Sequence, residues 1–353
     1  MAVSPLEHPF YRDLVGDNEI AGHFAADREW MQFLRFEQAL AIAEAAEDLI
    51  PAAAAEAIGK AAPDPDVAAL AAATARDGVP IPEFVRQLRQ AVGEPHGKHV
   101  HFGATSQDVI DTALVLRLAA VSSILDQRLG MLVAALEQLS ARFGDRRLMG
   151  RTRMQDALPI TVGDRIESWS LPLARHLTRL EELRPRLLVL QFGGAVGTLN
   201  ALGGKGGAVA ERLAAGLGLG LPPRNWHTQR DGLAEFAGWL SLVSGSLGKL
   251  GSDVALMAQN NVGEIELDGG GTSSAMPHKH NPVAAEVLVA LARYNATLLP
   301  AMHHALVAEQ ERSGAAWTLE WLTLPQMTVT TGAALRTAIG LVGAVRGMGT
   351  IDG

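Results

Sequence analysis

A glycine-rich segment in the last third of the chain concentrates hydroxyl and ionisable side chains. Residues 269–282 begin with three glycines and carry Ser273, Ser274, Lys279 and Asn281 within a short span. Hydroxyl and ammonium groups at this density suit proton transfer and the binding of an anion. The glycines allow the backbone to hinge, and the Asn-Pro pair that ends the segment is typical of a helix start. We therefore interpret the segment as a mobile lid that carries chemistry rather than as a plain structural loop.

A second polar segment, residues 99–108, precedes a long apolar pattern. Thr105 and Asp108 have the spacing of a capping box, so the sequence predicts a helix start there. Ser106 lies in the predicted first turn, where free N–H groups and the helix dipole favour an anion. His101 stands just ahead of this turn and is the histidine best placed to orient a carboxylate or to relay a proton. A helix start without further function is the alternative interpretation.

A third segment, residues 193–207, is rich in glycine and raises the question of a nucleotide-binding loop. It contains neither G-x-G-x-x-G nor G-x-x-x-x-G-K-[ST], and no clear βαβ unit surrounds it. We therefore predict a tight connection between helices, in which Thr198 and Asn200 supply polar contacts.

The histidines raise the question of a metal site. His96, His99 and His101 form an H-x-x-H-x-H pattern, and further pairs stand at 278 with 280 and at 303 with 304. No carboxylate companion of the H-E-x-x-H kind accompanies them, and the chain contains no cysteine. We expect no metal and no organic cofactor. A metal-dependent hydrolase built on these histidines is the most distant alternative.

Composition excludes several other classes of protein. The 353 residues are 48% hydrophobic but only 5% aromatic, which favours helices over a β-sandwich and excludes wholesale disorder. Thirty basic against 38 acidic residues give a net charge of −8 without a long basic run, so nucleic acid is a poor partner. The N-terminus lacks a signal-peptide pattern and no uninterrupted apolar stretch reaches the length of a membrane span. We expect a soluble, cytoplasmic protein without a membrane partner.

The apolar periodicity predicts an all-α protein, because apolar positions recur at helical spacing and strand signals are almost missing. In the first hundred residues we expect helices over 28–49, 67–76 and 81–92. Much longer helical patterns cover 105–142, 162–183, 230–265, 282–311 and 318–348. Pro172, Pro300 and Pro325 are expected to kink or divide three of these helices.

The change from short to much longer helical patterns near residue 105 predicts two domains. Residues 1–104 are expected to form a smaller N-terminal helical domain, and residues 105–353 an elongated bundle of long helices. The helix predicted over 105–142 would measure roughly 55 Å at 1.5 Å per residue. Long helices that are apolar on more than one side favour an oligomer.

Three segments together resemble the fumarase/aspartase superfamily, which includes adenylosuccinate and argininosuccinate lyases. Residues 271–282 are similar to the long signature loop of that superfamily, and residues 101–108 and 150–161 are similar to its two other motif blocks, in the expected order. Within the superfamily, residues 226–231 and 309–321 are most similar to the bacterial cycloisomerases that act on a carboxylated muconate. The resemblance covers nearly the whole chain.

The resemblance implies a homotetramer with a central bundle of long helices, in which each active site takes blocks from three different subunits. It implies a carbanion formed next to a carboxylate, with Ser273 as the catalytic serine and with Lys279 and Asn281 as the substrate-binding pair. His101 would orient a carboxylate or relay the proton. Family members usually continue into a third helical domain, whereas this chain stops at Gly353.

Arg153 is a departure from the superfamily pattern. The second motif block usually reads G-R-T-H-x-Q, and its histidine helps to protonate a departing group; here Arg153 takes the place of that histidine. When a lactone opens, the leaving group is a carboxylate, which is stable as an anion and needs no acid. An arginine can instead hold a carboxylate through two parallel hydrogen bonds. Arg153 therefore favours a cycloisomerase over the lyases.

The expected substrate is a small muconate with three anionic groups, the third being a carboxylate or a sulfonate. A polyanion needs local positive charge in an acidic protein, and arginines and helix starts can supply it. The expected substrate-binding residues are Thr105, Ser106, Arg151, Arg153, Gln155, Thr198, Ser274, Asn281 and Arg312. An adenylosuccinate-type lyase and a non-catalytic structural member of the superfamily are the remaining alternatives.

Overall fold

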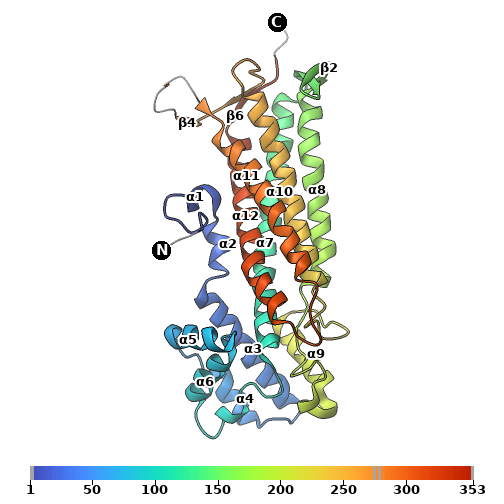
Figure 1. The fold of residues 1–353 in the computed structure, drawn as a ribbon. Coiled ribbons are helices and arrows are strands. Elements are labelled where there is room, and N and C mark those ends of the chain that lie inside the picture. Colours follow the sequence, from blue (N-terminus) through green and yellow to red (C-terminus); the bar gives the residue numbers. More distant parts are fainter. Residues whose placement is uncertain (1–3, 273–275, 277–279, 351–353) are drawn as a thin grey trace.

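The computed structural model describes residues 4–272, 276 and 280–350 (Figure 1). Long helices lie side by side in an elongated bundle, and short helices gather at one end of it. The long helices are α7 (Ser106–Phe143), α8 (Val162–Leu187), α10 (Asp231–Met257), α11 (Val283–His304) and α12 (Gly314–Gly343). The predicted all-α class and the elongated long-helix bundle are confirmed.

Helix α7 is the longest element that the structure describes. Thr105 and Asp108 form the predicted capping box at its start. Its 38 residues correspond to about 57 Å at 1.5 Å per residue. Leucines at seven-, four- and three-residue spacings lie fully buried along one face and face the other long helices: Leu118, Leu125, Leu129, Leu132 and Leu136. Because α7 traverses the bundle from the short helices to the opposite end, it sets the length of the molecule.

A second hydrophobic core lies among the short helices. These are α3 (Ala26–Ala46), α4 (Ala52–Lys60), α5 (Val67–Asp77), α6 (Ile81–Val92) and α9 (Gly206–Leu217). Phe36 and Phe84 are fully buried in this core, together with Val109 from the start of α7 and Leu213 from α9. The short helices are therefore packed directly onto the first turns of α7. The shorter α1 (Arg12–Val15) and α2 (Asn18–Gly22) precede α3.

Several predicted helices end earlier than expected, and strands follow two of them. Helix α10 stops at Met257, where the predicted helix ran to residue 265, and the chain turns again at Gly263, whose φ is +59°, before β3 begins. Helices α11 and α12 likewise end at His304 and Gly343. Prolines at 172, 300 and 325 do not divide their helices, which continue past them. Division at these prolines is therefore excluded, whereas a kink at each of them stays a prediction.

Within the described part of the chain, three two-stranded antiparallel sheets lie at the end of the bundle opposite the short helices (Figure 1). They pair β1 (Arg147–Thr152) with β2 (Gln155–Thr161), β3 (Ile265–Leu267) with β6 (Val345–Met348), and β4 (Gly271–Thr272) with β5 (His280–Asn281). Almost no residue pattern indicated these strands, because they are short and β2 is almost entirely exposed. An exposed strand has no buried face to impose an alternating pattern.

A buried amide joins three of the long helices near the middle of the bundle. The Asn295 side chain on α11 donates to the Ser244 hydroxyl on α10 at 3.0 Å and to the Thr331 hydroxyl on α12 at 2.9 Å. Its carbonyl oxygen accepts from the Thr330 hydroxyl at 2.7 Å. Since Asn295, Ser244 and both threonines are fully buried, this contact fixes how the three helices align.

Helix α11 differs from the other long helices in its exposed apolar surface. Among the described residues it is the helix that is long and apolar enough, by length and composition alone, to cross a membrane, which the sequence analysis did not expect. Only 28% of its most apolar stretch is buried inside the chain. It packs along α10 and α12, so the rest of its apolar surface faces outward from a single chain.

Candidate active site

The residues predicted to form the site fall into two groups. The α7-start group lies where α7 meets the short helices and consists of His101, Thr105, Ser106, Thr198 and Arg312. The strand-end group lies at the opposite end of the bundle and consists of Arg151, Arg153, Gln155 and Asn281 (Figure 1). The remaining predicted residues, Ser273, Ser274 and Lys279, lie outside the described residues. One chain therefore does not bring its own motif blocks together.

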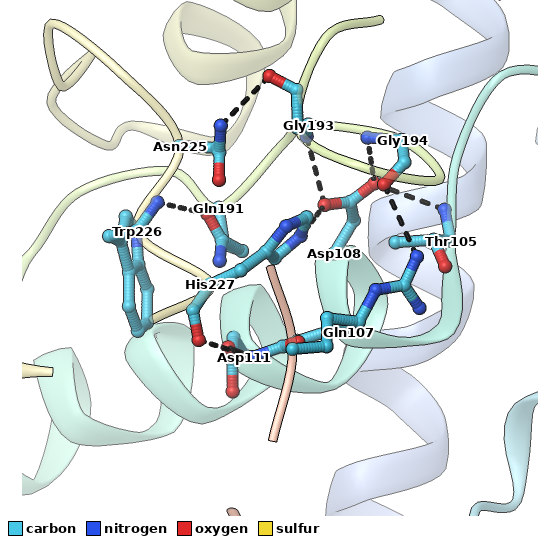
Figure 2. A network of polar contacts seen from close by, with 12 residues as sticks. Thr105, Gln107, Asp108, Asp111, Gln191, Gly193, Gly194, Asn225, Trp226 and His227 are labelled. Carbon is cyan, nitrogen blue, oxygen red and sulfur yellow. Dashed lines mark hydrogen bonds and ion pairs between the residues drawn. The ribbon is translucent and has the colours of Figure 1, made fainter. Parts of the chain in front are cut away.

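Asp108 organises the α7-start group. Its carboxylate is fully buried and accepts the Thr105 N–H at 3.0 Å, which completes the capping box. It also accepts the N–H groups of Gly193 and Gly194 at 2.9 Å each and faces His227 Nε2 at 2.8 Å (Figure 2). Four contacts to one carboxylate satisfy its charge and join the helix start to the glycine-rich segment. Sequence reasoning had assigned Asp108 only a capping role and His227 none.

The glycine-rich segment makes the predicted tight connection. Gly194 has a φ of +67°, and a Cβ at this position would lie 2.8 Å from the Gly103 carbonyl oxygen. Only glycine permits this approach to the chain ahead of α7. The Arg312 guanidinium donates to the carbonyl oxygens of Gly194 and Ala195, so Arg312 is held beside the same turn. Thr198 is exposed on that turn.

A buried ionic cluster lies behind the start of α7. Arg230 donates to Asp111 on α7 at 2.6 and 3.1 Å and to Glu320 on α12. Burial opposes its charge, but both carboxylates raise the pKa of Arg230 well above its usual value, so it stays protonated. Trp317 adds an indole N–H to Asp111 at 2.9 Å, and the Arg230 guanidinium lies 4.7 Å from the centre of the Trp226 ring. The cluster thus joins the two segments, 226–231 and 309–321, that the sequence analysis singled out.

His101 forms a two-point contact with Glu37 on α3. The backbone N–H of His101 donates to Glu37 Oε2 at 2.9 Å, and its Nδ1 lies 2.5 Å from Oε1. Glu37 is 1% exposed, and the His101 side chain is 15% exposed. Burial lowers the pKa of His101, but the charge and hydrogen bond of Glu37 outweigh burial and raise it above the ordinary histidine value. Sequence reasoning missed Glu37, although a carboxylate on the apolar face of the predicted helix was an available signal.

Glu44 lies two turns further along α3 and is also 1% exposed. Its Oε1 atom is buried and makes no hydrogen bond among the described residues. Burial, assisted by the charge of Glu37, raises the pKa of Glu44 to about 9. Glu44 is therefore protonated at neutral pH, whereas the neighbouring Glu37 carries the charge that faces His101.

The strand-end group includes a strained hairpin tip. Arg153 and Met154 form the two-residue turn between β1 and β2, with φ values of +51° and +66°. Residues other than glycine rarely adopt this region, and such strain gathers at functional sites. Both residues are exposed, as is Gln155, whose amide donates to the Met154 carbonyl oxygen. The tip thus presents the Arg153 side chain to solvent.

Arg151 is engaged by carboxylates of its own chain. It donates to Glu264 at 2.7 and 2.8 Å and lies 2.9 Å from Asp156. The hydrogen bond that Arg151 donates to Glu264 is the main cause of the raised pKa of Arg151. Within one chain its charge is therefore already balanced, in contrast to the exposed Arg153.

Asn281 lies beside a cavity at the same end of the bundle. It pairs with Gly271 in the β4–β5 ladder, and both residues line a cavity of about 640 Å³ between β3, the start of α11 and the end of α12. Across the described ranges, no three histidine, aspartate or glutamate side chains are grouped so as to hold a metal ion.

The chain belongs to the lyase family, whose model matches residues 23–294. More particularly, it is 45% identical to the 3-carboxy-cis,cis-muconate cycloisomerase of Pseudomonas aeruginosa, with 90% of this chain and 71% of the relative covered. It is 44% identical to the enzyme of that name from Pseudomonas putida, with 89% and 76% covered. The crystal structure of 3-carboxy-cis,cis-muconate lactonizing enzyme from Pseudomonas putida superposes with a TM-score of 0.91 at 41% identity, covering 96% of this chain and 77% of that one. These matches confirm the resemblance to the fumarase/aspartase superfamily.

Replacing Glu44 with glutamine should stabilise the protein at alkaline pH. The folded state raises the pKa of Glu44 from 4.5 to about 9. The stability that the protonated Glu44 contributes is therefore fully present below about pH 4.5 and is lost as the pH rises toward 9. A glutamine side chain has nearly the same shape as glutamate but carries no titratable group. Glu44→Gln should therefore increase the free energy of unfolding relative to wild type, and this gain should be on the order of 4 kcal/mol larger at pH 8 than at pH 5.

Urea unfolding at the two pH values measures this difference. Glu211→Gln, which changes an exposed glutamate on α9, is the matched control and should show no pH-dependent gain. An equal effect of Glu44→Gln at both pH values would contradict the assignment of a buried, protonated carboxyl group.

Proposed function

We propose that the protein is a 3-carboxy-cis,cis-muconate cycloisomerase. One carboxylate of the substrate adds across a double bond of the same molecule and closes a five-membered lactone, and the carbon next to another carboxylate takes a proton. Such a reaction belongs to the protocatechuate branch of the β-ketoadipate route in the cytoplasm. The observation that carries the proposal is Arg153, a cation at a strained, exposed tip where related lyases use a histidine acid. Relatives named for this activity are 44–45% identical over about nine-tenths of the chain.

The two groups supply complementary parts of this chemistry. At the start of α7, the N–H groups near Thr105 and Ser106 and the cations Arg312 and His101 favour a polyanion. At the other end, Arg153, Gln155 and Asn281 can hold further carboxylates. Thr198 and Ser274 complete the set of proposed substrate contacts, and Arg151 joins it if substrate displaces its carboxylate partners.

Proton transfer is assigned to Ser273, which donates to the carbanion and accepts the proton in the reverse direction. A serine hydroxyl is too weak an acid or base unaided, so its oxyanion needs stabilisation by backbone N–H groups or by Lys279. Both residues lie outside the described part of the chain. The leaving carboxylate of the open lactone is stable as an anion, so the reaction needs neither a metal nor an organic cofactor.

A complete site requires more than one copy of the chain. The two groups lie at opposite ends of α7, about 57 Å apart by its 38 residues, and a straight helix cannot bring them together. Helix α11 leaves most of its apolar stretch unburied in one chain, and further copies can cover it. We therefore propose a homotetramer whose sites combine the α7-start group of one subunit with the strand ends and 269–282 segments of two others.

Purified protein should remove the ultraviolet absorbance of 3-carboxy-cis,cis-muconate, because lactone closure breaks the conjugation of the diene. The rate should be the same with and without EDTA. If a folded oligomer leaves the absorbance unchanged, the proposed substrate is wrong, and the 3-sulfo analogue and then adenylosuccinate become the substrates to test. A rate that EDTA abolishes contradicts metal-free catalysis.

Two inactive variants should restore activity when they assemble together. His101→Gln removes a group from the α7 start, and Ser273→Ala removes the proposed proton donor. If each site draws these two residues from different subunits, random mixed tetramers keep up to about one quarter of their sites intact. The measurement is the activity of co-expressed, doubly tagged hybrids, with the double variant as the inactive control. Sites contained within one chain predict no recovery.

Arg153→His should lower kcat/KM for lactonisation by about tenfold or more, because an imidazole cannot make the paired hydrogen bonds of a guanidinium to a carboxylate. Steady-state kinetics at pH 8, where a free histidine is neutral, measures the loss. Arg76→His changes an exposed arginine on α5 and serves as the control. Full activity of Arg153→His would remove the argument that arginine selects this reaction.

A further inference from the structure

We infer that Glu37 is a positioning residue that holds His101 as a fixed imidazolium, leaving Nε2–H to bind a carboxylate of the substrate. The inference rests on the proposed function and decides between the two roles expected of His101, proton relay and carboxylate binding. Glu37 itself is too deeply buried, at 1% exposed, to meet the substrate. Its effect is transmitted through the ring that it contacts.

The geometry fixes the ring at two points. The same carboxylate faces both the backbone N–H of His101 and its Nδ1 atom, at 2.9 and 2.5 Å. Both contacts are possible because His101 adopts a φ of +64°, a strained conformation for a histidine. With Nδ1 facing a carboxylate, the proton on that nitrogen is retained, and the opposite nitrogen, Nε2, remains for another partner. Among the described residues none is bonded to Nε2.

The charges around His101 favour its protonated form. Glu37 on α3 is the nearest anion, and Asp108 on α7 also raises the pKa of His101, whereas Arg89 on α6 lowers it. Asp108 is already satisfied by its four contacts, and Arg89 donates to the Val100 carbonyl oxygen at 3.0 Å. The carboxylate that is left to balance an imidazolium is therefore Glu37.

Glu44 completes this charge arrangement. It is the second carboxyl group on the same part of α3, but its raised pKa keeps it protonated at neutral pH. The three groups then hold one negative charge on Glu37, one positive charge on His101 and none on Glu44. A neutral pair of this kind can remain buried, and an approaching anion meets only the exposed edge of the imidazolium.

An imidazolium of this kind cannot act as a base, because both of its ring nitrogens already carry protons. It can donate a charge-assisted hydrogen bond, which is about twice as strong as a neutral one. His101 therefore anchors the substrate at the α7 start, together with the N–H groups of the first turn. The abstraction of a proton from the substrate therefore falls to a residue elsewhere in the site.

The test is Glu37→Gln, with propane-1,2,3-tricarboxylate as a non-reacting probe measured by calorimetry from pH 5 to 9. We expect the wild-type protein to bind this tricarboxylate from pH 5 up to the raised pKa of His101. At pH 8, Glu37→Gln should bind the tricarboxylate about tenfold more weakly than wild type, and this difference should shrink toward pH 5. Glu44→Gln is the matched control, equally buried on the same helix, and should follow wild type. A loss of equal size at every pH would mean a structural role and would overturn the inference.

A direct titration separates this inference from the proposed function. In protein labelled at histidine Cε1, the His101 resonance, assigned with His101→Gln, should titrate above the ordinary histidine range and move at least one pH unit lower in Glu37→Gln. An unmoved titration, or a wild type that binds no tricarboxylate, overturns the inference. A shifted titration and retained binding in a protein that does not turn over 3-carboxy-cis,cis-muconate would refute the function and leave the inference standing.

Discussion

The rigidity of one long helix is the constraint on which the rest of the structure depends. Helix α7 begins at a capping box whose aspartate also holds the glycine turn, and it then runs the length of the bundle before β1 starts. A hydrogen-bonded helix of this length does not fold back, so the groups at its two ends remain apart in one chain. Chemistry that needs both ends is therefore inseparable from assembly.

The buried cluster of Asp111, Arg230 and Glu320 explains how one end keeps its geometry. It joins α7, α10 and α12 where charges have little access to water. Removing Arg230 would leave two buried carboxylates without a compensating charge, at a cost of about 3–5 kcal/mol. The start of α12 is thereby held against the start of α7, and Arg312, just ahead of α12, stays beside the glycine turn. A structural ionic cluster thus supports the proposed binding surface without being part of it.

Local patterns predicted much of this structure, and long-range pairs escaped prediction. The capping box at Thr105 and the helix over 81–92 follow from residues a few positions apart, and both are found as predicted. The contacts of Glu37 with His101 and of Asp108 with His227 join residues 64 and 119 positions apart, and no periodicity encodes them. The strands were missed because β3, β4, β5 and β6 are only two to four residues long and β2 is almost entirely exposed, so none of them shows a sustained alternating pattern. The shared site was suggested by resemblance alone, because helix lengths say nothing about which copy completes it.

Asn295 and its hydroxyl partners have a consequence for how this molecule can vary. An apolar stripe tolerates sliding, whereas an amide that must meet hydroxyls on two neighbours at once fixes the axial alignment of α10, α11 and α12. A residue inserted on either side would rotate the remainder of the helix by about 100° and shift it by about 1.5 Å. Insertions and deletions should therefore be confined to the loops and to the ends of the helices. The length of the bundle is then hard to change in evolution.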